Sequence, residues 1–224
     1  MRQLPLALGF DREPAFSHFV AGGNAVVLTA LQAMVQPGPP VYLWGPAGVG
    51  KTHLLRALVG HWRQLGGRCG WFDAEQALPW PFDEGWALIV IDGAERLDPA
   101  RQHAAFTLFV EAATHGVQVA SAGRLPPVDL PVRDDLRTRF GWGPVYELQP
   151  LADAQVRLAL KQEAAQRRLV LSDEVLDHLQ TRFARDLASL MALLGRLDDF
   201  SLAEKRAITV PLLKKMVAEE GQTP

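Results

Sequence analysis

The segment GPAGVGKT, residues 45–52, constrains the fold of this chain more than any other stretch. An apolar run at 41–44 precedes it, and a helical pattern of leucines and a tryptophan follows from about 51 to 65. Its fixed positions match G-x-x-x-x-G-K-[ST], a loop whose backbone N–H groups turn toward phosphates at a helix N-terminus. The strand–loop–helix context disfavours a chance glycine-rich turn, so the segment predicts a nucleotide phosphate-binding loop.

The polar positions of this loop have expected roles. Lys51 is expected to reach the β- and γ-phosphates, and the Thr52 hydroxyl to ligate Mg²⁺. The run ALIVID predicts a partner strand that ends at Asp92, where P-loop proteins hold the magnesium ion. An ordinary strand-end carboxylate is the alternative for Asp92. The nucleotide-binding residues predicted from loop and strand are Gly45, Pro46, Ala47, Gly48, Val49, Gly50, Lys51, Thr52 and Asp92.

Strand and helix patterns alternate up to residue 151, after which only helical patterns follow. The alternation predicts an α/β fold, in which helical crossovers join parallel strands and cover both faces of the sheet. We expect an N-terminal arm at 1–15, an α/β nucleotide-binding subdomain at 16–151 and an all-helical subdomain at 152–224. Strands are expected at 41–45, 67–73, 87–92 and 117–123, and helices at 24–35 (capped by Asn24), 51–65, 100–115, 153–168, 173–183, 185–200 and 209–219.

The composition of the chain indicates its cellular compartment more than it indicates a function. A net charge of −2 and an isoelectric point near 6.3 give no global electrostatic reason to expect direct DNA binding. The single cysteine, Cys69, allows no intramolecular disulfide, which fits a reducing compartment. No apolar run is long enough for a membrane span, and the N-terminus does not resemble a signal peptide. We therefore expect a cytoplasmic protein with no membrane partner.

Two further segments carry a family resemblance. FSHFVAGGNAVVLTAL, residues 16–31, resembles the start of the ATPase domain of the bacterial replication initiator DnaA. DDLRTRFGWGPVYELQPL, residues 134–151, is similar to box VII of that family and the segment after it. The resemblance implies an AAA+ fold with a helical lid that binds ADP or ATP with Mg²⁺. It also implies that Phe19, Val20 and Gly22 line the nucleotide pocket.

Within that family, the chain resembles the regulatory Hda proteins more than the initiator. It stops at Pro224, so the initiator's C-terminal DNA-binding domain is not expected here. The segment QLPLAL resembles the motif that docks Hda proteins on the DNA polymerase sliding clamp, although Ala7 stands where such peptides often have proline. A terminal strand or disorder is the alternative for so short a motif. The residues implied to bind the clamp are Gln3, Leu4, Leu6 and Leu8.

The resemblance also assigns roles to arginines. Box VII implies that Arg139 is an arginine finger that acts on nucleotide held by a neighbouring subunit, with Arg137 as the second candidate. A surface ion pair is the alternative for either. In the predicted lid, the segment ARDL is similar to the sensor 2 motif, which implies that Arg185 contacts the phosphates of bound nucleotide. Arg182 is a nearby alternative, and helix capping would explain either of these two residues.

Two positions depart from the family pattern for hydrolysis. Gly93 stands where the initiator has a second acidic residue after the magnesium-linked aspartate. Gly123 stands where it has the sensor 1 aspartate, if the segments are aligned on the following arginine. Glu95 lies two residues from the first position, where the shift at a strand end redirects its side chain. Ser121 lies two residues from the second position, and a partial substitution by its shorter side chain stays open, although its register differs. The sequence therefore predicts nucleotide binding with weak or absent hydrolysis.

Together these features predict a nucleotide-binding regulator of chromosome replication initiation. Docked on the sliding clamp, it would offer Arg139 to ATP bound by DnaA and so stimulate its hydrolysis. Its expected partners are the clamp and DnaA, with DNA reached mainly through the clamp, and self-association stays open. The alternatives are an autonomous AAA+ ATPase such as a helicase loader, and a DNA-binding paralogue of the initiator.

Overall fold

The computed structural model describes residues 14–183 and 186–220. The chain divides into two compact units, with the boundary between Pro150 and Leu151.

The first unit is built on a five-stranded sheet in which every pair of neighbouring strands is parallel. The strand order is β2-β3-β4-β1-β5, so β1 lies between β4 and β5 rather than beside β2. This order brings the carboxyl ends of β1, β3 and β4 to one edge of the sheet, the edge at which ligands bind in open α/β folds. The strands are β1 (Val41–Trp44), β2 (Arg68–Asp73), β3 (Trp86–Asp92), β4 (Gln118–Gly123) and β5 (Val145–Glu147).

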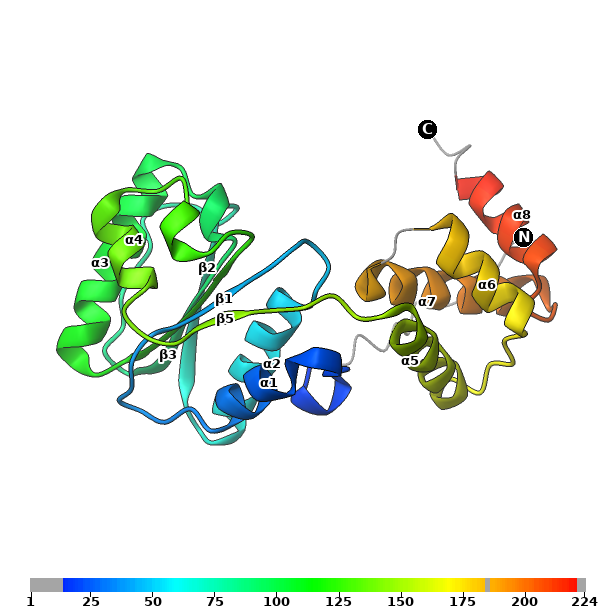
Figure 1. Cartoon of the computed structure of the whole chain (residues 1–224), viewed down its shortest axis with the longest axis horizontal. Coiled ribbons are helices and arrows are strands. Elements are labelled where there is room, and N and C mark those ends of the chain that lie inside the picture. The colour runs from blue at the N-terminus through cyan, green and yellow to red at the C-terminus, as the bar shows by residue number, and fades with distance from the viewer. Residues whose placement is uncertain (1–13, 184–185, 221–224) are drawn as a thin grey trace. The chain divides into compact units, whose positions relative to one another are not determined.

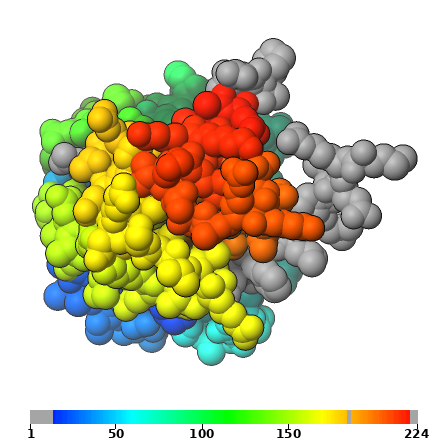
Figure 2. Space-filling view, turned by 90° about the vertical axis from the view of Figure 1, so that its right-hand side faces the viewer, coloured from blue at the N-terminus to red at the C-terminus, as the bar shows by residue number. Residues whose placement is uncertain are grey.

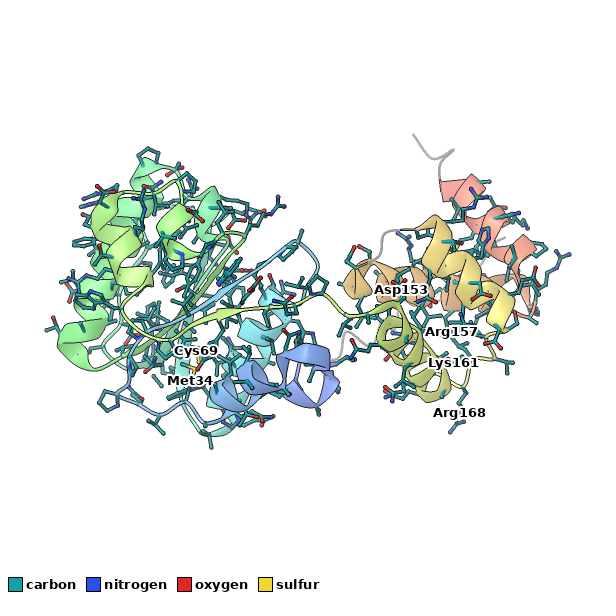
Figure 3. The ribbon with its side chains drawn as sticks, viewed as in Figure 1. Met34, Cys69, Asp153, Arg157, Lys161 and Arg168 are labelled. Carbon is teal, nitrogen blue, oxygen red and sulfur yellow. The ribbon has the colours of Figure 1, made fainter. Side chains whose placement is uncertain are left out.

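Alternating side chains of the strands form two separate hydrophobic clusters, because successive residues of a strand face opposite sides of the sheet. Ile89 and Ile91 pack with α3 and α4, whereas Leu88 and Val90 pack with α1 and α2. Met34 and Cys69 lie against the second cluster (Figure 3). Helices cover both faces of the sheet (Figure 1). They are α1 (Ala25–Gln32), α2 (Lys51–Gln64), α3 (Pro99–His115) and α4 (Asp134–Phe140). The connecting segments contain short 3₁₀ turns, among them η1 (Phe16–His18), η2 (Gly22–Asn24) and η3 (Ala94–Arg96).

The second unit is a lid of four helices with a hydrophobic core of its own. Leucines, valines and a methionine from all four helices form that core, and α8 lies against α6 and α7 (Figure 2). On the surface, Arg157 and Lys161 of α5, labelled in Figure 3, both form ion pairs with Asp173 at the start of α6, at 2.9 Å. The helices are α5 (Asp153–Gln166), α6 (Asp173–Arg182), α7 (Leu187–Glu204) and α8 (Val210–Glu220).

These observations confirm the predicted fold class, a parallel sheet flanked by helices followed by an all-helical lid. One local prediction is wrong: the Asn24 side chain does not cap α1. Its amide instead donates to the carbonyl oxygen of Gln149 at 2.9 Å and accepts from the N–H of Gln149 at 2.7 Å. Within the described part of the chain, no helix is both long and apolar enough to cross a membrane.

Candidate functional site

The phosphate-binding loop joins β1 to α2, as its sequence predicts. Gly45 directly follows β1, and Lys51 and Thr52 form the first turn of α2. The Lys51 ammonium donates hydrogen bonds to the carbonyl oxygens of Gly45 and Pro46, both at 2.7 Å. The loop therefore curls around its own lysine at the N-terminus of a helix, where N–H groups and the helix dipole favour bound anions.

Thr52 and Asp92 come together at the edge of the sheet. The Thr52 hydroxyl donates to Oδ2 of Asp92 at 2.7 Å, and Asp92 is only 8% exposed. Burial raises the pKa of Asp92, although the hydrogen bond from Thr52 and the nearby charges of Arg96 and Lys51 oppose that shift. A hydroxyl and a carboxylate oxygen at this distance fit Mg²⁺, which takes few protein ligands and completes its shell with phosphate oxygens and water.

The segment predicted to line the nucleotide pocket lies beside the loop. The ring centre of Phe19 lies 5.9 Å from that of His53 in the first turn of α2. A Cβ atom at Gly50 would lie 2.7 Å from the ring of Phe19. Val20 follows in the same extended stretch and is half-buried. Gly22 begins the next 3₁₀ turn, η2. Phe19 is therefore the residue of this segment that contacts the phosphate-binding loop.

The chain after Asp92 places the Glu95 carboxylate at the end of β4. Gly93 has a left-handed backbone, with φ of 73° and ψ of 49°, and turns the chain directly into η3. Oε2 of Glu95 accepts from the N–H of Arg124 at 3.1 Å, and Oε1 lies 3.5 Å from the Arg124 Nε. Sequence register along β3 could not reveal this position, because the turn folds Glu95 back across the sheet edge.

The absence of a side chain at Gly123 leaves space for the side chains of Tyr42 and Glu95. A Cβ atom at this position would overlap the hydroxyl oxygen of Tyr42 and lie 3.1 Å from Oε2 of Glu95. The buried Tyr42 hydroxyl donates to the carbonyl oxygen of Leu125 at 3.0 Å. Ser121 is buried and donates to the carbonyl oxygen of Val41, away from the sheet edge. The residues that precede the two departures, Asp92 and Ala122, are partners in the sheet, and Glu95 lies against Gly123.

Charged side chains from three parts of the chain influence the pKa of Lys51 in the loop. Burial lowers the pKa of Lys51, and the carboxylates of Glu95 and Asp92 oppose that shift, while Arg124 adds to it. One of the two carboxylates that oppose the shift, Glu95, is a residue that the sequence did not assign to the site.

Arg139, near the end of α4, lies over aromatic rings. Its guanidinium carbon is 3.8 Å from the ring centre of Trp142 and 5.6 Å from that of Phe106 on α3. Trp142 is 56% exposed. Among the described residues, Arg139 has no carboxylate partner, so its N–H groups remain available to an anion. The aromatic residue three positions after the arginine is the sequence signal that could have revealed this arrangement.

The other arginine of α4 is engaged in the fold. Arg137 donates to the carbonyl oxygens of Leu130 and Val132 and forms an ion pair with Asp134 at 2.9 Å. These bonds secure the segment that enters α4 and use most of the guanidinium donors of Arg137.

Several predicted site residues fall elsewhere. Arg182 is the last residue of α6. Arg185 lies outside the described residues, as do Gln3, Leu4, Leu6 and Leu8, which the sequence predicts to bind the clamp. Their predicted roles rest on the sequence alone.

Comparisons with known proteins agree with this architecture. Residues 153–217 match the protein family described as "Hda, lid domain". Domain III of the Thermotoga maritima replication initiation protein DnaA is similar over 93% of this chain and 97% of its own, with a TM-score of 0.77 and 19% identity. AMPPCP-bound DnaA from Aquifex aeolicus is similar over 93% of this chain and 69% of its own, with a TM-score of 0.69 and 21% identity.

The same fold occurs in a branch migration motor. The RuvB Holliday junction motor of Thermotoga maritima is similar over 87% of this chain and 66% of its own, with a TM-score of 0.62 and 17% identity. The match to the Hda lid family confirms the resemblance inferred from the sequence. The chain therefore resembles the Hda lid family over residues 153–217, and it shares its fold with the DnaA structures.

Proposed function

We propose that this chain is a nucleotide-binding regulator of replication initiation that stimulates hydrolysis of ATP held by DnaA. It docks on the sliding clamp through the segment from Gln3 to Leu8 and presents Arg139 to the nucleotide of its partner. The Hda-type lid and the DnaA-like fold support a role connected with DnaA.

The observation that carries this proposal is the contrast between the two arginines of α4. Arg137 is bound to backbone carbonyls and Asp134, whereas Arg139 lies over Trp142 and Phe106 without a carboxylate partner among the described residues. A guanidinium held on aromatic faces keeps its orientation and its five donors free. It can then stabilise the charge that develops on a transferring phosphoryl group.

The chain's own site supports binding of ADP or ATP with Mg²⁺. The phosphate-binding loop, Lys51 and the Thr52–Asp92 pair supply the groups that phosphates and a magnesium ion require. Similar DnaA structures contain AMPPCP, a nucleotide analogue. Phe19 supplies an aromatic wall beside the loop, and Arg185 of the lid remains a further proposed phosphate ligand.

Replacement of Arg139 by alanine tests the central step. We expect the variant to lose most of the stimulation of ATP hydrolysis by DnaA, because arginine fingers contribute roughly 10³–10⁵ in rate where they act. The assay measures phosphate release from ATP-bound DnaA in the presence of the clamp loaded on DNA. Arg133→Ala is the matched control, since the Arg133 guanidinium also lies over Phe106, at 5.9 Å, but forms an ion pair with Asp135.

Full stimulation by Arg139→Ala would show that the finger is not Arg139. Equal losses in both variants would indicate a general charge effect of this surface. The chain without partners is measured in the same assay: steady-state turnover at a rate that matches the stimulated reaction would favour an autonomous ATPase instead. Tight duplex binding at physiological salt would favour a DNA-binding paralogue of the initiator.

A further inference from the structure

A groove of about 230 Å³ lies between α2 and β2, the strand at one edge of the sheet. Val59 and Gly60 line it from α2, Cys69 and Trp71 line it from β2, and Pro14 completes this lining. The Cys69 thiol, labelled in Figure 3, donates to the carbonyl oxygen of Val59 at 4.0 Å. Burial raises the pKa of this thiol, so it is neutral and acts as a small apolar group. This part of the groove is therefore uncharged and largely apolar.

Two arginines of α2 also line the groove. Arg56 and Arg63 are both exposed and lie seven positions apart, which corresponds to two helical turns and a rise of about 10 Å. The guanidinium carbon of Arg56 lies 5.8 Å from the ring centre of Trp71. Among the described residues neither arginine has a carboxylate partner, whereas Arg68 on β2 forms an ion pair with Asp83. The groove therefore presents two positive charges that are not neutralised, with an apolar surface between them.

This pattern of charge and shape matches an extended acidic peptide. In an extended chain alternate side chains lie on one face, and residues four positions apart are separated by about 13 Å. Two long arginine side chains can meet carboxylates at that spacing, and guanidinium groups bind carboxylates through paired N–H donors. An apolar side chain midway between the two carboxylates would then lie in the groove.

A nucleic acid strand matches the same arginines less well. The Trp71 Nε1–H donates to Oδ2 of Asp73 at 3.1 Å, so a carboxylate lies beside the aromatic ring on which a base would have to stack. The net charge of the chain is −2, so no wider positive field would attract a polyanion. A peptide that carries only two negative charges avoids both difficulties.

We propose that the groove between α2 and β2 binds an extended acidic segment of a partner protein, in which an apolar residue has a carboxylate two positions away on each side. Arg56 and Arg63 bind the two carboxylates, and the apolar side chain packs on Val59 and Cys69. This interaction goes beyond the proposed function, because it involves neither bound nucleotide nor Arg139. It can therefore hold or fail independently of the stimulation of DnaA.

The probe is a short synthetic peptide in which single serines separate a central leucine from two glutamates. Titration calorimetry with the full chain should give a dissociation constant of about 10⁻⁴ M. Arg56→Ala and Arg63→Ala should each weaken binding about threefold, and the double variant about tenfold. Arg68→Ala is the matched control, because it removes the same charge from β2 but from an ion pair with Asp83. It should change the affinity by less than about 1.5-fold.

Gly60 allows the shape of the groove to be tested without a change of charge. A Cβ atom at Gly60 would meet only the carbonyl oxygen of Pro14, at 3.6 Å, which is an ordinary van der Waals contact. Gly60→Leu should therefore keep the fold, since leucine favours helices more than glycine does. Its side chain should fill part of the groove and weaken peptide binding about threefold or more, although both arginines remain. Thermal unfolding verifies that each variant keeps its fold.

The remaining outcomes overturn the inference. A parent chain that does not bind the peptide would do so, as would equal weakening by Arg68→Ala. Equal binding of a peptide with glutamines for the glutamates, or with serine for the leucine, would show that the groove recognises neither feature. Tight binding of an oligothymidylate that depends on Arg56 and Arg63 would assign the groove to nucleic acid. Peptide binding that requires deletion of residues 1–13 would assign it to the chain's own N-terminal segment.

Discussion

At the scale of single residues, Asp92 shows why a buried carboxylate is retained at a cost to stability. Burial raises its pKa, so the ionised form is less favourable in the folded than in the unfolded chain. For an acid whose folded pKa is raised, the contribution to stability is present at low pH and is lost as the pH rises through that pKa. At neutral pH the charge of Asp92 therefore lowers the free energy of unfolding of the free protein, and bound Mg²⁺ would offset that loss.

Asp92→Asn should accordingly stabilise the free protein and weaken its binding of magnesium nucleotide. Thermal unfolding near pH 7 without nucleotide should give a higher Tm for the variant than for the parent, and the difference should shrink near pH 4. The affinity for ADP with Mg²⁺ should fall by about tenfold or more, as expected for loss of a bond to a charged group. The dependence on Mg²⁺ should fall with it.

Asp98→Asn provides the comparison for this pH effect, since Asp98 is an exposed helix cap whose pKa is lowered by its hydrogen bonds with Arg101. Removal of the Asp98 charge should lower the Tm at neutral pH, whereas Asp92→Asn should raise it. A lower Tm for Asp92→Asn at neutral pH would show that Asp92 is a structural partner of Thr52 rather than a strained metal ligand.

At the scale of elements, the helices and strands follow the sequence patterns closely, and the misses have tertiary causes. The apolar run at 87–92 and the motif at 45–52 fix β3 and the start of α2, because strand burial and loop chemistry are local properties. The role of Asn24 could not be seen, because its partner Gln149 is distant in the chain and meets it only after β5 joins β1.

The pairing of β1 with β4 limits the size of the side chain that fits at position 123. Gly123→Asp would restore the residue that the family pattern expects, but its Cβ would overlap the buried Tyr42 hydroxyl. We expect this variant to lose about 1–3 kcal/mol of unfolding free energy, the usual cost of overpacking a close-packed site. Urea unfolding measures the loss.

Tyr42→Phe removes the hydroxyl and should make the Gly123→Asp substitution less costly. The double variant should therefore be more stable than the sum of the single effects predicts, with a coupling of about 0.5–3 kcal/mol. Additive single effects would show that the strands shift apart without a clash, and the glycine would then not be required by Tyr42.

At the scale of the whole molecule, the proposed nucleotide binding and the proposed clamp docking are assigned to different parts of the chain. The described residues that contact the phosphate-binding loop begin in the segment that contains Phe19. The proposed clamp motif precedes them, at Gln3 to Leu8. These two activities should therefore be separable by truncation.

Deletion of residues 1–8 should abolish capture of the chain by immobilised sliding clamp while leaving the affinity for ADP unchanged. Because stimulation of DnaA is proposed to require docking, the truncated chain should also lose stimulation in the presence of clamp on DNA. Ala7→Pro, which restores the residue that Hda-type peptides often have, should retain or increase capture. Capture of the truncated chain at the level of the parent would place the clamp contact elsewhere.

The sequence by itself determined the parts of this protein that depend on local chemistry. A phosphate-binding loop, a buried strand ending at Asp92, and an α/β pattern that changes to helices after residue 151 all follow from residue type and spacing. The fold class and the family resemblance could be predicted from them, since glycine, lysine and apolar periodicity act over a few residues.

Only the tertiary structure decided which side chains share the edge of the sheet. Glu95 and Gly123 are 28 positions apart in the sequence, and they meet because η3 turns back over β4. Arg139 and Phe106 likewise meet because α4 packs on α3. Electrostatic and steric interactions depend on distance in space, so a register counted along one strand could not locate the carboxylate at the end of β4 or the rings beneath Arg139.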